Sequence, residues 1–189
     1  MSKKIILASK SPRRCEILRK LGIDFEIVLS DAEEITDSLH YTEIAMVNAI
    51  RKADAVAAKY PDTAVIGADT VIELDGKVLG KPSDIDDAKR MLRSLSGRKH
   101  HVVTGVCVRR ISPELFIRFA DISTVEFKKL SDADIENYLS KVHVLDKAGA
   151  YAVQEHGDII IKSVDGSVDN VIGLPGGRLA EALRLNKLI

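Results

Sequence analysis

An acid and a hydroxyl, Asp69 and Thr70, stand between the two strongly apolar runs of residues 65–68 and 71–72. A carboxylate placed between such runs is costly to bury unless a metal ion or a ligand partners it. Carboxyl groups beside low-dielectric walls are also where perturbed, chemically useful acids are found. We therefore predict a catalytic role for Asp69, with a simple turn in which the carboxylate bonds its own backbone as the alternative.

Two further acids, Glu33 and Glu34, could share a metal ion with Asp69. They are adjacent in sequence, so in an extended segment only one of them faces inward. Mg²⁺ takes one or two protein carboxylates and completes its octahedron with water and substrate phosphates. One of the two glutamates together with Asp69 would therefore suffice for a magnesium site.

Near the N-terminus, an apolar run ends abruptly in the hydroxyls and paired guanidinium groups of residues 9–14. Ser11 suits the N-cap position and Pro12 the first position of a helix. The exposed N–H groups and the dipole of a helix N-terminus favour an anion, and Arg13 and Arg14 add forked donors that fit phosphate oxygens. These features predict a polyphosphate site, with a surface turn that happens to carry two arginines as the alternative.

Two lysines could contribute to the same site. Lys52 lies among small apolar residues at helical spacing, which could aim it inward, although a surface lysine with a partly buried stem is the plainer interpretation. Lys81, between Gly80 and Pro82, stands in a stiff loop after a hairpin, where a phosphate contact is reasonable.

Alternating strands and helices must position these groups. A purely parallel, doubly wound fold is disfavoured because two long segments with alternating polarity, residues 101–111 and 115–127, are predicted to pair antiparallel. We expect a mixed α/β fold that forms one domain over residues 1–189. Further strands are predicted at residues 5–8, 25–29, 64–68, 70–74 and 77–79, a hairpin at residues 159–172, and helices from Pro12, at 42–60, at 84–95, from Ser131 and from Pro175.

Composition excludes several classes of protein. Basic and acidic side chains number 28 each, and there are four Phe, four Tyr and no Trp, which argues against a nucleic-acid binder. No apolar run approaches the length of a membrane span, and no signal-peptide pattern opens the chain. Cys15 and Cys107 form no metal or disulfide motif, which suits a reducing compartment. We expect a cytoplasmic protein with neither a nucleic-acid nor a membrane partner.

Seven motifs in order resemble the Maf family of nucleoside triphosphate pyrophosphatases over essentially the whole chain: ILASKSPRR, RKADAVA, VIGADTVI, GKP, LSGRKHHVVTGV, DKAGAYAVQ and GSVDNVIGLP. The resemblance implies a central mixed β-sheet with flanking helices and a cleft between two lobes, similar to the inosine triphosphate pyrophosphatases. It also implies metal-dependent hydrolysis of a nucleoside triphosphate to the monophosphate and pyrophosphate, of use in removing non-standard nucleotides. Arg13, Thr70 and Gln154 stand where branches of the family differ, and they look like the branch acting on dTTP and UTP. A homodimer is compatible with the resemblance.

The resemblance leads to a mechanistic hypothesis. Glu34 and Asp69 would hold Mg²⁺ or Mn²⁺, and Asp69 is also the candidate base for the attacking water. These two roles of Asp69 partly compete, because metal coordination lowers the basicity of a carboxylate. The rival function is a nucleotide-sensing regulator of septum formation with little turnover. The presence of Glu34, Lys52, Asp69 and Lys81 favours the enzyme. The predicted substrate-binding residues are Ser9, Ser11, Arg13, Arg14, Lys52, Thr70, Lys81 and Gln154.

Overall fold

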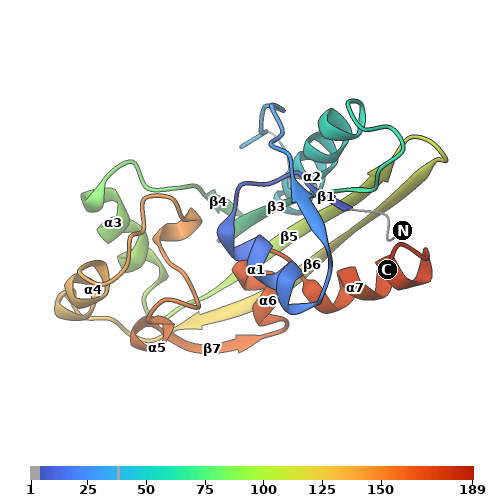
Figure 1. The fold of residues 1–189 in the computed structure, drawn as a ribbon. Helices are drawn as coiled ribbons and strands as arrows, with labels where there is room; N and C mark the ends of the chain where they lie inside the picture. The colour runs from blue at the N-terminus through green and yellow to red at the C-terminus, as the bar shows by residue number, and fades with distance from the viewer. Residues whose placement is uncertain (1–4, 38) are drawn as a thin grey trace.

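A seven-stranded mixed sheet forms the centre of the computed structural model, which describes residues 5–37 and 39–189 (Figure 1). Its order is β2-β1-β3-β5-β6-β7, with β4 beside β3. β1 runs parallel to β2 and β3, whereas the other neighbours are antiparallel, so the expected mixed α/β fold is confirmed. The strands are β1 (Ile5–Leu7), β2 (Phe25–Ile27), β3 (Val65–Leu74), β4 (Lys77–Leu79), β5 (Lys99–Arg110), β6 (Leu115–Phe127) and β7 (Ile161–Asp165).

Helices on the sheet create two lobes, which Figure 1 shows at opposite ends of the long strands β5 and β6. One core joins α1 and α7 to one face of β3 and β5, while α2 covers the opposite face. A second core gathers α3, α4, η1 and α5 around the other end of the sheet. None of the described helices is long and apolar enough to cross a membrane. The helices are α1 (Pro12–Lys20), α2 (Tyr41–Ala57), α3 (Ile85–Leu95), α4 (Asp132–Leu139), η1 (Ala148–Ala150), α5 (Gly157–Ile160), α6 (Val168–Ile172) and α7 (Gly176–Leu185).

The predicted hairpin at residues 159–172 is wrong in its second half. β7 does pair with β6, but the following segment is the helix α6. The Ser167 side chain caps this helix by accepting a bond from the Asn170 N–H. The buried Asn170 amide also donates to the Val102 carbonyl at 3.0 Å and to Ser123 Oγ at 2.9 Å. These tertiary bonds favour a helix at a site where local apolar alternation predicted a strand.

α2 lies directly on the sheet because the facing residues are small. Ala45, Ala49 and Ala53 are fully buried on the helix, and Gly67 and Gly105 stand opposite them on β3 and β5. A Cβ atom on Gly105 would collide with the Ala45 carbonyl oxygen, and one on Gly67 with the Ala49 carbonyl oxygen. This close approach brings the polar side chains on the same face of α2 down to the surface of the sheet.

Adding a single methyl group at Gly105 tests the close contact between β5 and α2. Because the Ala45 backbone cannot yield as a flexible side chain would, we expect Gly105→Ala to lower the free energy of unfolding by about 1–3 kcal/mol. Displacement of α2 should also lower the hydrolytic turnover that the sequence resemblance implies. Urea unfolding and a rate assay would measure both effects. Gly177→Ala is the control, since its added methyl meets nothing within 4 Å. Wild-type stability in Gly105→Ala would contradict the close approach.

Candidate active site

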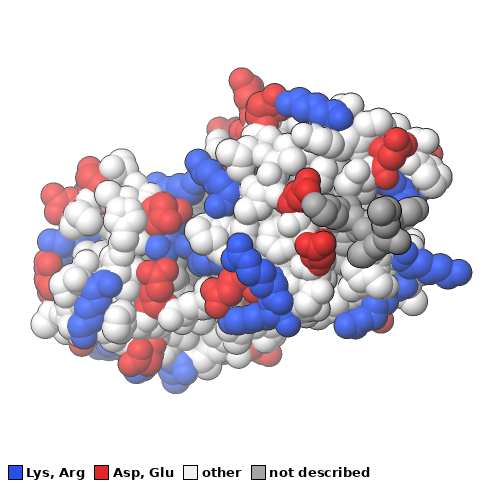
Figure 2. All heavy atoms as spheres, viewed as in Figure 1, with Lys and Arg blue, Asp and Glu red and all other residues white. Residues whose placement is uncertain are grey.

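The candidate site lies at a gap in the sheet beside β3. β1 pairs with β3 only at Val65 and Ile66, and β4 pairs with it only from Ile72 onward. Among the described residues, no strand pairs with β3 on this side between those positions. The chain leaves β1 and β4 toward the gap and carries Ser9 and Lys81 there. Figure 2 shows Lys and Arg side chains gathered where the two lobes meet.

The pleat of β3 sends the two chemically interesting neighbours to opposite faces of the sheet. Asp69 points toward α2, where it meets Asn48 and Lys52. Thr70 points toward α1 and meets Arg14. Asp69 is paired with Gly105 inside a continuous strand, so it is not the residue of a local turn.

Lys52 bridges two carboxylates. Its Nζ atom lies 2.8 Å from Asp69 Oδ1 and 2.6 Å from Glu34 Oε1. The Lys52 side chain is only 13% exposed, so it is not a surface lysine. Partial burial raises the pKa of Glu34, but the hydrogen bond and charge of Lys52 outweigh it and hold that pKa below its usual value. The charges of Lys81 and Arg14 act in the same direction, which places both within electrostatic reach of Glu34.

Asn48 belongs to this cluster although the sequence analysis did not single it out. Its Nδ2 atom donates to Asp69 Oδ2 at 3.0 Å, and its amide also bonds the backbone of Ile35, next to Glu34. One signal was available in the sequence, since Asn48 precedes Lys52 by four residues and therefore shares its helix face. An amide among the alanines of that face needs a buried partner.

Arg14 organises the opposite face of β3. Its Nη1 atom donates to Ser9 Oγ at 3.0 Å, Nη2 to Thr70 Oγ1 at 3.1 Å and Nε to the Gly173 carbonyl at 2.8 Å. Burial lowers the pKa of Arg14, while the charge of Asp69 opposes that shift. The Thr70 hydroxyl also lies 2.9 Å from Thr104 Oγ1. Arg14 therefore ties the end of β1, the middle of β3 and the loop before α7 to one another.

The remaining predicted residues surround this framework with fewer contacts. Ser11 makes no capping bond through its side chain, and its N–H donates to Ser9 Oγ at 3.2 Å. Partial burial raises the pKa of Asp146, but Lys147, with a smaller contribution from the charge of Arg13, lowers it overall. Arg13 is therefore within electrostatic reach of the segment that leads to Gln154. Gln154 itself is exposed after η1, and the described contacts do not join it to Asp69.

Comparisons with known proteins show to which family a chain with this site belongs. The model of the family described as Maf-like protein matches residues 4–186. The chain belongs to the Maf family. A relative from Akkermansia muciniphila named dTTP/UTP pyrophosphatase is 51% identical over 172 residues, which are 90% of each chain. Another of the same name, from Bacillus velezensis, is 43% identical over 185 residues and 97% of each chain. The resemblance of the seven motifs to the Maf family is thus confirmed, and these relatives carry the name of the predicted branch.

The carboxylates of this Maf-family site suit a hard divalent cation. Glu34 and Asp69 direct oxygen atoms at one position, which the Lys52 ammonium group fills. Oxygen ligands of this kind favour Mg²⁺ or Mn²⁺. Across the described ranges, no group of three or more His, Cys, Asp or Glu side chains could hold an ion. Such a cation would therefore need water and substrate phosphates as further ligands.

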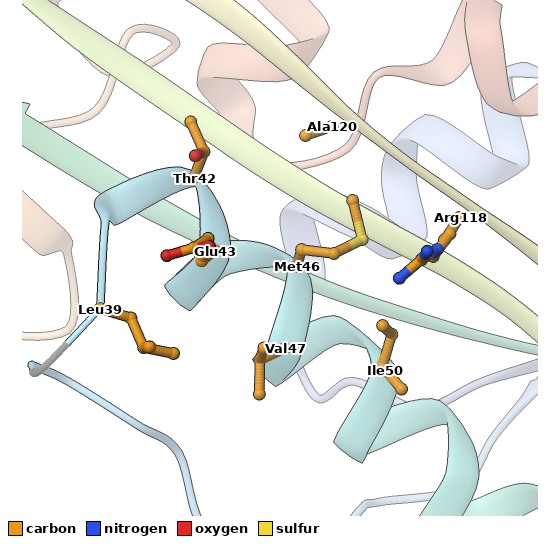
Figure 3. Close-up of a pocket in the computed structure, with 8 residues that line it drawn as sticks. All are labelled: Leu39, Thr42, Glu43, Met46, Val47, Ile50, Arg118 and Ala120. Atoms are coloured by element: carbon orange, nitrogen blue, oxygen red, sulfur yellow. The ribbon is translucent and has the colours of Figure 1, made fainter.

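A hollow separate from the candidate site lies beside α2 in this Maf-family chain, on the side of β6 (Figure 3). It is an open and largely apolar groove between that helix and β6, and none of the predicted site residues lines it. The face of α2 that carries Asn48 and Lys52 thus contributes to the candidate site, and its side next to β6 forms a separate surface. The groove is lined by Leu39, Thr42, Glu43, Met46, Val47, Ile50, Arg118 and Ala120.

Proposed function

We propose that this chain hydrolyses dTTP and UTP to the nucleoside monophosphate and pyrophosphate. The observation that carries the proposal is the bridge of Lys52 between Asp69 and Glu34, at the gap where the chain leaves β1 and β4. A carboxylate pair with an internal cation beside a basic helix N-terminus suits a polyphosphate better than a neutral substrate. The names of the relatives supply the substrate class.

In the proposed mechanism the triphosphate lies across the gap. Ser9, Ser11 and the N-terminus of α1 donate hydrogen bonds to it, and the charges of Arg13 and Lys81 favour its oxygens. Asp69 orients the water that attacks the α-phosphorus and takes its proton, and pyrophosphate leaves. A divalent cation held by Glu34 and Asp69 would stabilise the negative charge that develops on the phosphates.

Arg14 and Thr70 fit the proposal as residues that position the site. The bonds from Arg14 to Ser9 and to Thr70 hold the phosphate-binding segment against β3. Direct contact of Arg14 and Thr70 with the substrate stays a prediction. The burial of Arg14 favours a structural contribution, because its guanidinium group already serves three internal acceptors.

A nucleotide screen tests the proposal. Purified protein would be incubated with each nucleoside triphosphate and Mg²⁺ or Mn²⁺, and the products separated by anion-exchange chromatography. We expect the monophosphate and pyrophosphate in equal amounts. Release of inorganic phosphate and a diphosphate would contradict cleavage at the α-phosphorus. Tight nucleotide binding without turnover would favour the sensing function instead.

The base preference is expected to depend on Gln154. An amide presents one acceptor and two donors, and can therefore pair with a carbonyl and an N–H on the edge of uracil or thymine. We expect kcat/KM to be highest for dTTP and UTP, intermediate for CTP and lowest for GTP. Gln154→Glu removes the donor and should lower kcat/KM for UTP about tenfold to a hundredfold. Steady-state kinetics with the four nucleotides would measure this. GTP as the best substrate of the wild type would contradict the branch while leaving the reaction type intact.

A further inference from the structure

The side-chain amide of Asn48 is buried and engaged at both ends. Asn48 is 2% exposed on the inner face of α2. Its Oδ1 atom accepts a bond from the Ile35 N–H at 2.8 Å, and its Nδ2 atom donates to the Ile35 carbonyl at 2.8 Å. The second hydrogen of Nδ2 is directed to Asp69 Oδ2 at 3.0 Å. One amide therefore contacts both the segment that bears Glu34 and the carboxylate of Asp69.

The segment around Glu34 belongs to no helix or strand, so its position depends on such bonds. The two bonds between Asn48 and Ile35 imitate a pair of backbone bonds in a β-ladder. The other ties have at least one exposed partner: Arg51 Nη1 lies 3.3 Å from the Glu33 carbonyl, Lys59 pairs with Asp31 at 3.0 Å, and Lys52 pairs with Glu34 at 2.6 Å. Asn48 is thus the buried anchor of this segment on α2.

The same amide selects the orientation of Asp69. With Oδ2 held by Asn48, the Oδ1 atom is the one that faces Lys52 and, through it, Glu34. An amide can do this without adding a charge, whereas a second acid would repel Asp69 and a second lysine would compete with Lys52. The neutral donor therefore fixes the geometry of the carboxylate pair and leaves its net charge unchanged.

We propose that Asn48 is a positioning residue that sets the separation between Glu34 and Asp69 and thereby the affinity of the pair for a divalent cation. The inference rests on the proposed function for its consequence in turnover. A displacement of about 1 Å at a reacting centre can cost about a hundredfold in rate. Loss of the amide should therefore appear in kcat and in cation binding more than in the nucleotide KM at saturating Mg²⁺.

Two substitutions separate the two contacts of Asn48. Asn48→Ala removes every bond of the amide. Asn48→Asp keeps an oxygen that accepts the Ile35 N–H, but it replaces the donor to the Ile35 carbonyl and to Asp69 with an acceptor. We expect both variants to lose about a hundredfold in kcat. Asn48→Ala, which adds no charge to the carboxylate pair, should also bind Mn²⁺ more weakly in calorimetry without nucleotide.

Hydrogen exchange at the Ile35 amide distinguishes the variants without any turnover. We expect faster exchange in Asn48→Ala than in Asn48→Asp, because only Asn48→Asp keeps an acceptor for the Ile35 N–H. Ile135→Val, in α4 of the other lobe, is the control for a general loss of stability, and its kcat should equal that of the wild type. A kcat loss in Asn48→Ala no larger than in this control, or unchanged Mn²⁺ affinity in Asn48→Ala, would overturn the inference. If the wild-type protein hydrolysed no nucleotide, that result would contradict the proposed function instead. The Mn²⁺ affinity and the hydrogen exchange at the Ile35 amide would still decide the role of Asn48.

Discussion

Asp69→Asn is expected to lower kcat by about a thousandfold while the protein remains folded. The amide keeps the size of the side chain but removes the negative charge that faces Lys52 and the group that would take the proton from water. Asp69 is also one of the two carboxylates proposed to hold the cation, so both contributions disappear together. Steady-state hydrolysis of dTTP, with circular dichroism and thermal melting on the same samples, would measure the effect.

Asp54→Asn is a matched control for Asp69→Asn. Asp54 lies on α2 and pairs with Arg109 at 3.1 Å, but its side chain is 51% exposed and makes no contact with the cluster around Lys52. Exposed ion pairs contribute little to stability, so both turnover and melting temperature should stay near the wild type. A wild-type rate in Asp69→Asn would remove Asp69 from the mechanism.

Lys52→Met is expected to lower kcat/KM for dTTP by about a hundredfold to a thousandfold. The substitution removes a desolvated positive charge from the position where negative charge develops on the substrate. It also leaves Glu34 and Asp69 facing each other with no ammonium group between them. The melting temperature should therefore fall without a divalent cation, and added Mg²⁺ should raise it more than in the wild type.

Lys59→Met provides the comparison for Lys52→Met. Lys59 pairs with Asp31 at 3.0 Å, but its side chain is 55% exposed. We expect neither turnover nor the response of the melting temperature to Mg²⁺ to change in this variant. If Lys52→Met behaved as Lys59→Met does, the bridge between the two carboxylates would have no part in catalysis. Lys52→Arg tests geometry, because its longer and planar group should not restore the rate.

The sequence by itself determined the strongly patterned parts of the fold. The alternation along β5 and β6 predicted an antiparallel pair, and the capping box at Ser131 predicted the start of α4. These features depend on periodicity and on neighbouring residues, which are local properties of a chain. The family was also predictable from the sequence, because its motifs are short contiguous segments. The apolar runs around Asp69 also made it the candidate catalytic residue, which stays a prediction.

Only the tertiary structure decided which groups meet. The helix α6 is stabilised by bonds from Asn170 to β5 and β6, which local apolar alternation does not encode. Arg14 donates a hydrogen bond to the carbonyl of Gly173, which is 159 positions away in the chain. The segment around Arg14 therefore could not show that its guanidinium group binds internal acceptors. The contact of Asn48 with Asp69 depends on the close approach of α2 to the sheet, and this approach requires the glycines Gly67 in β3 and Gly105 in β5. Long-range hydrogen bonds and backbone contacts of this kind depend on the arrangement of the whole sheet, and a local pattern therefore does not specify them.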